Sequence, residues 1–396
     1  MSKLTHNELA RKMGLFRTFE EAGSGHIFWE PNGFVVFDSL REWIQKAHEK
    51  RGYEFVKTPI IYRTELWKTS GHYDKYKENM YFLEVDGEEY GIKPMNCPAH
   101  ILIYKSRFRH ASELPLKLFE FGFVHRHELS GVLNGLLRVR SFTQDDSHIF
   151  CKPSHIQQVV SEVLELVNET FDKFGLHKRK YYLSTMPEKH IGTKEMWDSA
   201  TEMLKKALNA NNISYELKEG DGAFYGPKID VEVLDSLGRS WQLGTIQLDF
   251  NLPERFKLSY VDEEGRKQRP VMVHRAILGS LERFLGVLLE HTQGWLPLFL
   301  MPKQLEIIPL TEEQKEYAES ILNNIKERMP GSRISVEEPP SNLSKTIKAS
   351  IERRVPLLLI GKNEVEKGTV AFRYAGEQKE MPKEDFIDYF SNEAEI

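Results

Sequence analysis

Cysteine is scarce in this sequence, because only Cys97 and Cys151 occur among 396 residues. Two thiols exclude a disulfide framework and any zinc site built from four cysteines. Since reducing compartments keep thiols free, this scarcity favours an intracellular protein. We therefore expect a cytoplasmic location, with an organellar matrix, reached after removal of a presequence, as the alternative.

Long apolar runs and an excess of charge of one sign are missing as well. No segment approaches the roughly 20 apolar residues that a bilayer span needs, so we expect no membrane partner. The first residues, "MSKLTHNELARKMG", lack the apolar core of a secretory signal. The 54 lysines and arginines face 59 acidic residues. Overall charge therefore gives no indication of nucleic-acid binding, and a polyanion would have to meet local patches of arginine and lysine.

The sequence does contain two kinds of pattern, one after the other. Residues 30–295 predict a large antiparallel sheet edged by helices, with strands in "FYGPKIDVEVLD", "RSWQLGTIQLDFNL" and "RPVMVHRAI". Near residue 303 strands and helices begin to alternate, in the βαβ pattern of a small α/β domain. We therefore predict an α+β chain with one domain over 1–300 and another over 301–396.

Local signals predict three elements within the first domain. Apolar residues at helical spacing predict a helix over 36–52. Ser154 is suited to capping a second helix that runs to about residue 174. The Asp86-Gly87 pair predicts the turn of a hairpin over 79–93.

The segment "LLRVRSFTQDDSHIF", residues 136–150, predicts a strand with an unusual face. Side chains alternate along a strand, so its even-numbered residues share one side. These residues are Arg138, Arg140, Phe142, Gln144, Asp146 and His148. Two cations, an aromatic ring, an amide, a carboxylate and an imidazole are expensive to bury together. This face therefore predicts a binding site.

His148 is the natural metal ligand on this face, since neutral imidazole is the commonest protein ligand. Cys97 in "KPMNCPAH" and His274 in "PVMVHRAI" could join it from other segments. Such a set gives tetrahedral zinc three protein ligands and leaves one position open, as in working rather than structural sites. The alternative is that both histidines are hydrogen-bonded core residues. Cys151 is expected to face away as a small buried side chain.

Arginines near this strand indicate an anion site. Arg126 and Glu128 in "VHRHELSG" precede a loop, after which the chain returns with Arg138 and Phe142. Arginine forks bind phosphate oxygens in pairs, and an aromatic ring can stack on a flat base. Arg283 in "GSLERF" could add a third cation. The alternatives are a solvated hairpin with cross-strand salt bridges and an ordinary surface arginine.

Together these segments resemble the class II aminoacyl-tRNA synthetases. Arg126-x-Glu128 with its loop and returning strand resembles their motif 2, "GSLERF" their motif 3, and the helix and strand ending at Pro59 their motif 1. Six segments, in order, are similar to the threonyl-tRNA synthetase family: "SGHYDKY", "KPMNCPAH", "RVRSFTQDDSHIFC", "GDGAFYGPKIDVEV", "GTIQLDFNLPERF" and "PVMVHRAILGSLERF". The likeness begins near residue 6 and continues, more loosely, through the α/β domain, which resembles the anticodon-binding domain.

For the amino acid, the resemblance implies that Cys97, His148 and His274 hold one zinc ion per chain. Its open positions would receive the amino and hydroxyl groups of threonine. This would reject valine far better than the roughly 10²-fold that a pocket without a polar reader achieves. Asp146 would pair with the ammonium group. The residues that match the amino-acid pocket are Gln144, Asp146, Gln242, Gln247 and Ser280.

For ATP and its Mg²⁺, the resemblance implies a second set of residues. Arg126 would grip the α-phosphate and Arg283 the γ-phosphate, with Phe142 stacked on adenine. The residues that match the ATP site are Arg126, Glu128, Arg138, Phe142, Lys228 and Arg283. His72 in "SGHYDKY" matches a proposed base that acts on the terminal ribose of tRNA. The expected catalytic residues are Arg126, Arg283, Lys228 and His72.

The implied activity is that of a threonine–tRNA ligase, which forms threonyl-adenylate from threonine and ATP and transfers threonine to the 3′ end of tRNA(Thr). The implied assembly is a homodimer joined through motif 1. One alternative is a non-catalytic paralogue that serves as a nucleic-acid-binding accessory subunit. Another is a synthetase of the same subclass for serine, proline or histidine.

Two departures from the family pattern stand out. The family often carries an N-terminal domain that hydrolyses seryl-tRNA, yet the matches begin almost at Met1. We therefore expect no editing in cis, so that a separate protein would have to clear seryl-tRNA. In the α/β domain, "VEEPPSNLSKTIK" replaces an arginine-asparagine-glutamate segment of bacterial relatives. Arg353, Glu364 and Arg373 are expected at anticodon-reading positions, with ordinary surface charge as the alternative.

Overall fold

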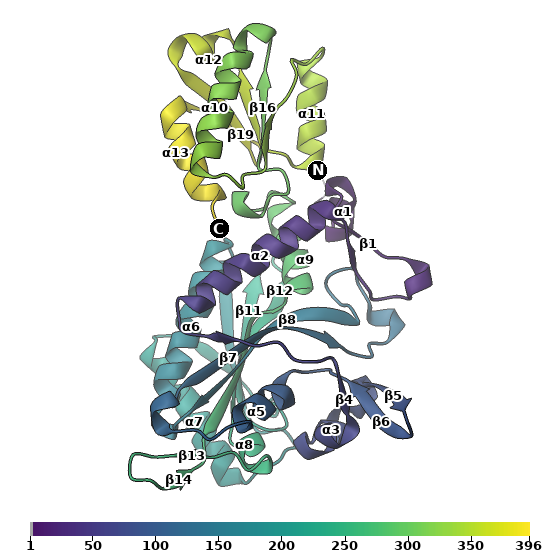
Figure 1. Cartoon of the computed structure of the whole chain (residues 1–396), viewed down its shortest axis with the longest axis vertical. Coiled ribbons are helices and arrows are strands. Elements are labelled where there is room, and N and C mark those ends of the chain that lie inside the picture. The colour runs from purple at the N-terminus through teal and green to yellow at the C-terminus, as the bar shows by residue number, and fades with distance from the viewer. Residues whose placement is uncertain (1–2) are drawn as a thin grey trace. The chain divides into compact units, whose positions relative to one another are not determined.

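The computed structural model of the protein describes residues 3–396 (Figure 1). The described chain divides into two compact units. The large unit consists of Glu20–His26 and Lys46–Val287, and the small unit contains the rest, including Leu288–Ile396. Met1 and Ser2, where the predicted first domain begins, lie outside the described residues, and the boundary at residue 300 stays a prediction. No helix within 3–396 is long and apolar enough to cross a bilayer.

An eight-stranded sheet forms the centre of the large unit, with the strand order β10-β9-β11-β12-β15-β8-β7-β3 (Figure 1). All pairings from β9 to β7 are antiparallel, as predicted. The pairings at the two edges, β10 with β9 and β3 with β7, are parallel. In chain order the strands are β3 (Glu54–Phe55), β7 (Leu116–His125), β8 (Ser141–Cys151), β9 (Arg179–Ser184), β10 (Tyr215–Lys218), β11 (Lys228–Leu234), β12 (Ser240–Asp249) and β15 (Val271–Ser280).

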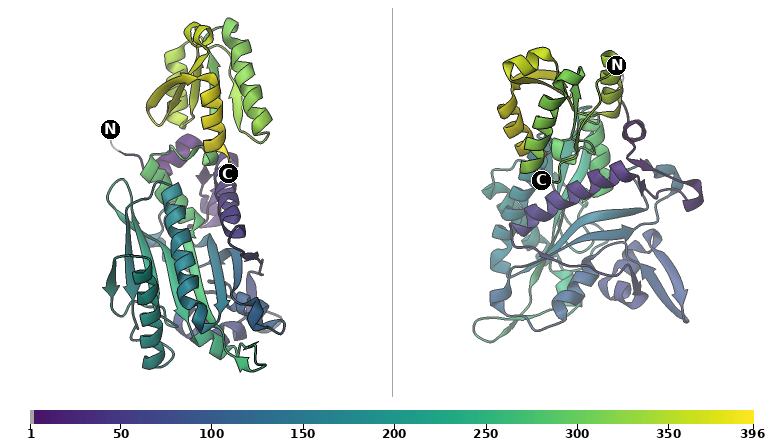
Figure 2. Two further views of the ribbon diagram at one scale, coloured as in Figure 1. Left: turned by 90° about the vertical axis from the view of Figure 1, so that its left-hand side faces the viewer. Right: turned by 45° about the horizontal axis from the view of Figure 1, so that its top comes forward.

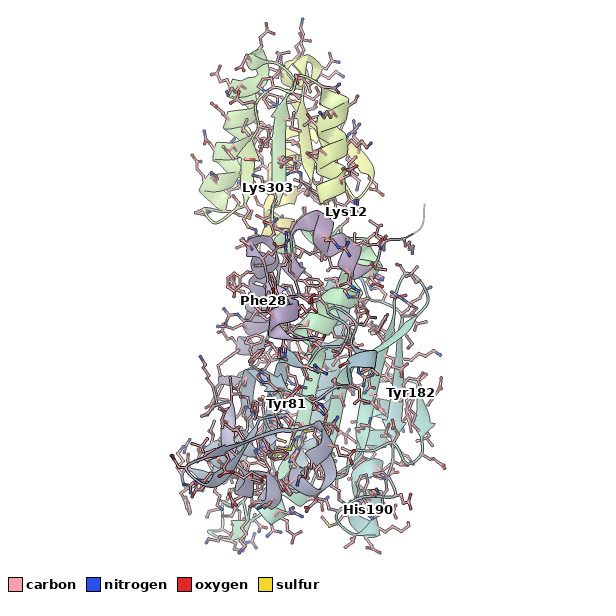
Figure 3. All side chains as sticks on the ribbon, turned by 90° about the vertical axis from the view of Figure 1, so that its right-hand side faces the viewer. Lys12, Phe28, Tyr81, Tyr182, His190 and Lys303 are labelled. Atoms are coloured by element: carbon pink, nitrogen blue, oxygen red, sulfur yellow. The ribbon has the colours of Figure 1, made fainter. Side chains whose placement is uncertain are left out.

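Two long helices, α6 and α7, lie side by side over one face of this sheet (Figure 2). In Figure 3, Tyr182 on β9 lies toward the right of the large unit and Tyr81, in the predicted hairpin, lies nearer the middle of the view. The apolar residues of α6 at helical spacing are buried, as the sequence predicts. A 3-10 turn precedes α6, so Ser154 is not its N-cap and the predicted cap is wrong. The helices of this unit include α3 (Thr64–Ser70), α4 (His72–Tyr76), α5 (Cys97–Lys105), α6 (Ile156–Lys173), α7 (Lys194–Ala210) and α8 (Asn251–Arg255).

The predicted hairpin is confirmed as β5 (Tyr81–Val85) and β6 (Glu88–Ile92). Asp86 and Gly87 both have positive φ, at 53° and 76°. That conformation is the one a two-residue hairpin turn with the right-handed strand twist requires. The third strand of this small sheet is β4 (Ile61–Arg63).

The unusual strand is shorter than predicted. It begins at Ser141, and residues 136–140 form a turn and a bridge in which Arg138 pairs with Asn134. Arg138 and Arg140 therefore precede β8 instead of belonging to it. The side chain of Arg140 donates to the backbone oxygens of Glu128 and Ser24, so it holds the loop together.

The small unit contains a five-stranded sheet in the order β17-β16-β18-β19-β20 (Figure 1). Alternate residues of its strands pack in two separate apolar clusters, with α10 and α13 over one face and α11 over the other. The predicted βαβ alternation is confirmed, whereas β20 and α13 carry no signal that we identified. The elements are β16 (Leu305–Pro309), α10 (Lys315–Arg328), β17 (Ile334–Val336), α11 (Leu343–Arg353), β18 (Leu357–Ile360), α12 (Lys362–Lys367), β19 (Thr369–Tyr374), β20 (Glu377–Pro382) and α13 (Lys383–Ala394).

Other elements have the following bounds. The predicted helix over 36–52 is α2, which begins at Pro31 and ends at Glu49. Proline suits a first helical position, because no earlier carbonyl needs its N–H. The remaining elements are α1 (His6–Met13), β1 (Phe16–Arg17), β2 (Phe28–Trp29), β13 (Tyr260–Val261), β14 (Lys267–Gln268) and α9 (Leu281–Thr292).

Candidate functional site

A cavity of about 580 Å³ lies along β8, β12 and β15 of the large unit. Most of the predicted site residues line it, together with apolar side chains such as Met95 and Leu278. The predicted residues in the lining are Cys97, Arg126, Glu128, Arg138, Phe142, Gln144, Asp146, His148, Gln242, Gln247, His274, Ser280 and Arg283.

Strand register explains why residues distant in the sequence meet here. His274 on β15 lies opposite His148 on β8 and opposite Gln247 on β12. Ser280 lies opposite Gln144 in the same way. Directly opposed residues have Cβ atoms about 4.5–5.5 Å apart. Three neighbouring strands thus place a row of polar side chains on one surface.

Cys97, His148 and His274 form a buried cluster in the cavity lining. Each offers one ligand atom, and these atoms lie within 4.8 Å of one another. Cys97 is the first residue of α5, and Pro98 follows at a position that tolerates proline. One thiol and two imidazoles are the donor set of a zinc ion that keeps a fourth position open.

Hydrogen bonds determine which nitrogen each histidine can offer to a metal. Nε2 of His274 lies 2.8 Å from Oδ2 of Asp249. Nδ1 of His148 lies 2.8 Å from Nδ1 of His100. The nitrogens left for an ion are therefore Nδ1 of His274 and Nε2 of His148. Metal-binding histidines almost always make such a second hydrogen bond, so the residues present fit a zinc ion.

The charges around the cluster favour a cation. Burial, followed by the carboxylates of Asp146 and Asp249, raises the pKa of the Cys97 thiol well above its usual range. Burial also lowers the pKa of His148 well below its usual range, so its imidazole is neutral. Zinc binds thiolate and neutral imidazole, and its charge would offset the two carboxylates.

Asp146 has its own support within the lining. Nδ2 of Asn96 donates to Oδ2 of Asp146 at 2.9 Å. The side chain of Asn96 packs over Gly122 on β7, where a Cβ atom would lie 2.2 Å from Nδ2. Further along, Gln242 donates to Oδ1 of Asp230 at 2.7 Å. These contacts hold the amide and carboxylate groups in fixed orientations.

Three predicted site arginines line the cavity, and the guanidinium of each has different contacts. The guanidinium of Arg126 lies over the ring of Phe142, 5.1 Å from its centre, and Nε donates to the backbone oxygen of Pro94. Arg138 forms a salt bridge with Glu128 at 2.9 Å. Nε of Arg283 has no hydrogen-bond partner among residues 3–396.

Two predicted catalytic residues lie outside the lining. His72 is fully buried, with Nδ1 2.8 Å from Oγ of Ser70 and Nε2 3.4 Å from Sγ of Cys97. Burial, more than its charged neighbours, lowers the pKa of His72 to about 3. Lys228 pairs with Asp230 at 2.8 Å. Their predicted roles stay predictions, because neither side chain reaches the cavity surface directly.

Sequence reasoning missed several residues that hold the site in place. Asp145, whose odd number places it on the opposite face of β8, accepts three backbone N–H groups of β15. Glu282 accepts the backbone N–H of Thr143. In the sequence, Asp145 stands out only as a second aspartate beside Asp146, and Glu282 only as an acidic residue before Arg283. Neither pattern predicts which backbone groups these carboxylates bind.

The predicted anticodon residues each have a partner within the small unit. Arg353 pairs with Glu306 at 3.2 Å. Oε2 of Glu364 accepts the backbone N–H of Gly361, at the start of α12. Arg373 donates to Gln378. Their predicted role remains a prediction.

Comparison with protein families gives two matches. Residues 81–292 match the tRNA synthetase class II core domain (G, H, P, S and T). Residues 304–393 match an anticodon binding domain.

Individual proteins give closer matches. Over 98% of its length the chain is 48% identical to a threonine–tRNA ligase of Campylobacter concisus. Over 97% it is 49% identical to one of Helicobacter hepaticus. The chain spans 64% of the length of each of these curated relatives.

Solved structures agree with these matches. The chain is similar to the RNA binding domain of threonyl-tRNA synthetase from Cryptosporidium parvum, with a TM-score of 0.90 and 41% identity over 98% of both chains. A putative threonyl-tRNA synthetase from Aeropyrum pernix has a TM-score of 0.85 and 32% identity, over 99% of this chain and 98% of that chain.

Proposed function

This chain belongs to the threonyl-tRNA synthetase family of class II aminoacyl-tRNA synthetases, and we propose that it is a threonine–tRNA ligase. A carboxylate oxygen of threonine attacks the α-phosphorus of ATP, the bond to the bridging oxygen breaks, and pyrophosphate leaves. A ribose hydroxyl at the 3′ end of tRNA(Thr) then attacks the carbonyl carbon, and AMP leaves. The observation that carries this proposal is a single cavity lined both by the Cys/His/His cluster and by Arg126 and Arg283.

At the amino-acid end, Cys97, His148 and His274 would hold a zinc ion. Zinc held there would act as a Lewis acid toward the amino and hydroxyl groups of threonine. Asp146 accepts a hydrogen bond from the amino group of threonine, and Asn96 orients the Asp146 carboxylate by donating to Oδ2. Gln144, Gln242, Gln247 and Ser280 line the remainder of this end.

At the nucleotide end, Arg126 binds the α-phosphate and Arg283 the γ-phosphate, with Mg²⁺ accompanying ATP. Positive charge at the α-phosphorus stabilises the charge that builds up in the transition state. Phe142 stacks on adenine, while Glu128 and Arg138 exchange part of their salt bridge for contacts with the nucleotide. The unpaired Nε of Arg283 supports this role, because a half-buried guanidinium with an N–H that lacks an acceptor favours an anion.

Transfer to tRNA involves parts of the chain beyond the cavity. The small unit contains the match to an anticodon binding domain, so it binds tRNA(Thr), with Arg353, Glu364 and Arg373 as candidate contacts. Lys228 acts near the phosphates and His72 as a base on the terminal ribose. Since His72 is buried in this structure, tRNA binding would have to bring the ribose or a bridging water to it.

We further propose that two copies of the chain form a homodimer through motif 1. Apolar side chains near Pro59 are exposed, which is unusual for a cluster on one monomer surface. These are Phe55, Ile60, Ile61 and Phe123. A second copy that covers them would account for their exposure.

Pyrophosphate exchange with single amino acids tests the activity, with zinc measured in the same sample. We expect exchange with threonine, about one zinc per chain, and exchange with serine lower by about 10–200-fold, because serine lacks only a methyl group. Valine should support far less exchange, because it lacks the hydroxyl ligand. Charging of tRNA(Thr) tests the second step.

A matched pair of variants serves as the control. Arg126→Gln should abolish exchange, whereas Arg63→Gln, which alters an exposed salt bridge with Glu88, should leave it unchanged. Absence of threonine-dependent exchange in folded protein would favour a non-catalytic accessory subunit. Exchange with proline or histidine instead would assign the chain to another amino acid.

A further inference from the structure

A line of buried polar groups leads away from the cavity behind His148. Nδ1 of His148 lies 2.8 Å from Nδ1 of His100 on α5. Nε2 of His100 lies 3.2 Å from Oε2 of Glu120 on β7. Glu120 also accepts hydrogen bonds from Thr58 and from Nζ of Lys93. The side chains of His100, His148, Glu120 and Lys93 are all at most 4% exposed.

With both imidazoles uncharged, the donors and acceptors along this line can be assigned in only one way. Ionised Glu120 only accepts, so Nε2 of His100 must carry a proton. The uncharged His100 ring then has a lone pair on Nδ1, which accepts a hydrogen bond from the protonated Nδ1 of His148. Neutral His148 is left with its lone pair on Nε2. The proton on His148 is thus placed by a carboxylate that does not touch it.

We infer that His100 and Glu120 are positioning residues, which hold His148 in the tautomer that offers Nε2 to the metal. This inference rests on the proposed zinc site. His100 touches neither the amino acid nor ATP, and it acts through His148. The metal affinity of the site therefore depends on two residues outside the metal cluster and outside the cavity lining.

The position of His100 on α5 strengthens this inference. Cys97 and His100 are three residues apart on one helix, so their side chains lie on the same face. The first turn of α5 thus supplies one metal ligand and the hydrogen-bond partner of another. A displacement of α5 would disturb both at once.

Lys93 and Thr58 keep Glu120 in the acceptor state. Burial raises the pKa of Glu120, but hydrogen bonds from His100 and Thr58, together with the charge of Lys93, lower it to about 2. The pair of Glu120 and Lys93 also adds no net charge behind the metal site. The other ligand, His274, reaches a carboxylate without an intermediate, at Asp249.

Variants of His100 test this inference through zinc affinity, measured by competition with a chromophoric chelator. His100→Leu removes both hydrogen bonds, and we expect zinc affinity to fall by about 10–100-fold, as for other residues that support metal ligands. His100→Gln can accept from His148 and donate to Glu120, because a carboxamide carries its oxygen and nitrogen on one carbon. It should restore most of the affinity.

Ile101→Val is the matched control, because Ile101 is the next residue on α5 and is fully buried. Ile101→Val should leave zinc affinity unchanged, although it also alters the packing of α5, as His100→Leu does. The absorption spectrum of the Co²⁺-substituted protein provides a second readout. We expect this spectrum to change in His100→Leu. In His100→Gln and Ile101→Val it should match the spectrum of the wild type.

The outcomes separate the inference from the function on which it rests. Wild-type protein without zinc affinity would overturn both the metal site and the positioning role. Zinc-binding wild type together with an unchanged His100→Leu would overturn the positioning role alone. If His100→Leu does not fold, Glu120→Gln serves as the test variant. A carboxamide can donate to Nε2 of His100 as well as accept from it, so it no longer requires the proton of His100 to lie on Nε2. Lower zinc affinity then supports the inference, and unchanged affinity overturns it.

Discussion

The carboxylate of Asp145 accepts the backbone N–H of Gly279 at 3.0 Å. It also accepts those of Ile277 at 2.8 Å and Leu278 at 3.1 Å. The pairing of β8 with β15 is interrupted at these three residues, so their N–H groups lack strand partners. Asp145 satisfies them from the middle of β8, and this contact places Ser280 and α9 next to the cavity.

Asp145→Asn tests this contact. The amide would direct an NH₂ group at backbone N–H groups, and we expect the free energy of unfolding to fall by about 2 kcal/mol. The KM for ATP in pyrophosphate exchange should rise, because Arg283 follows the displaced segment. Urea denaturation and exchange kinetics measure the two effects. The exposed Asp198→Asn on α7 is the control, and an equal result for both variants would contradict the prediction.

Glu282 makes the opposite connection, from α9 back to β8, and it predicts a pH dependence of stability. Burial raises the pKa of Glu282 from 4.5 to about 7. The folded protein therefore holds a proton that the unfolded chain has lost, and this contribution is complete below pH 4.5 and disappears as the pH rises through about 7. The loss amounts to about 3 kcal/mol.

Glu282→Gln removes this dependence. As the pH rises from about 5 to about 8, we expect the unfolding free energy of the wild type to fall relative to that of the variant. Urea titrations at several pH values measure it, and the comparison cancels all other ionisable groups. A difference that stays constant with pH would show that Glu282 does not titrate in this range.

Much of the fold could be predicted because its signals are local. The Asp86-Gly87 turn and the spacing of Val159 and Val163 depend on neighbours a few residues away. The parallel edge pairings, such as β3 with β7, depend on distant partners that no local pattern identifies. The strand β20, "EQKEMP", is almost entirely exposed and half of its residues are charged, so it lacks apolar alternation. The sequence of β20 therefore does not predict that it pairs with β19.

The site divides in a similar way. Alternation along β8 correctly grouped Gln144, Asp146 and His148, because an unbroken strand fixes which side each residue faces. Alternation failed for Arg140, which lies before the strand begins. It also could not reveal the role of Asp145, because that role depends on an interruption in β15. Residues that support a site through distant backbone are visible only after the chain is folded.

Arg283 predicts a conflict between stability and function. Its guanidinium is largely buried beside Arg138, and burial, followed by this like charge, lowers the pKa of Arg283. We expect Arg283→Gln to leave the unliganded protein as stable as the wild type or more stable, because a largely buried cation that forms no salt bridge within residues 3–396 is removed. ATP affinity should fall by about 10–100-fold, as a charged hydrogen bond is lost.

Thermal unfolding with and without ATP measures both effects on Arg283→Gln. The wild type should gain more stability from ATP than the variant does, since stabilisation by a ligand rises with the logarithm of its affinity. Arg63→Gln, on the surface, should behave as the wild type. A variant that melts earlier without ATP would show that Arg283 contributes to the fold itself.

Gly122 predicts a defect specific to the amino acid. A Cβ atom at this position would lie 2.2 Å from Nδ2 of Asn96, so Gly122→Ala must displace Asn96 from Asp146. Because the Asn96 amide helps to orient the carboxylate that binds the amino group of threonine, we expect the KM for threonine to rise by about 10–100-fold. The KM for ATP should change little. Gly331→Ala, where nothing lies within 4 Å of the added atom, is the control. Equal increases in both KM values would mean that the substitution disturbs β7 as a whole, and an unchanged KM for threonine would exclude Asn96 from amino-acid binding.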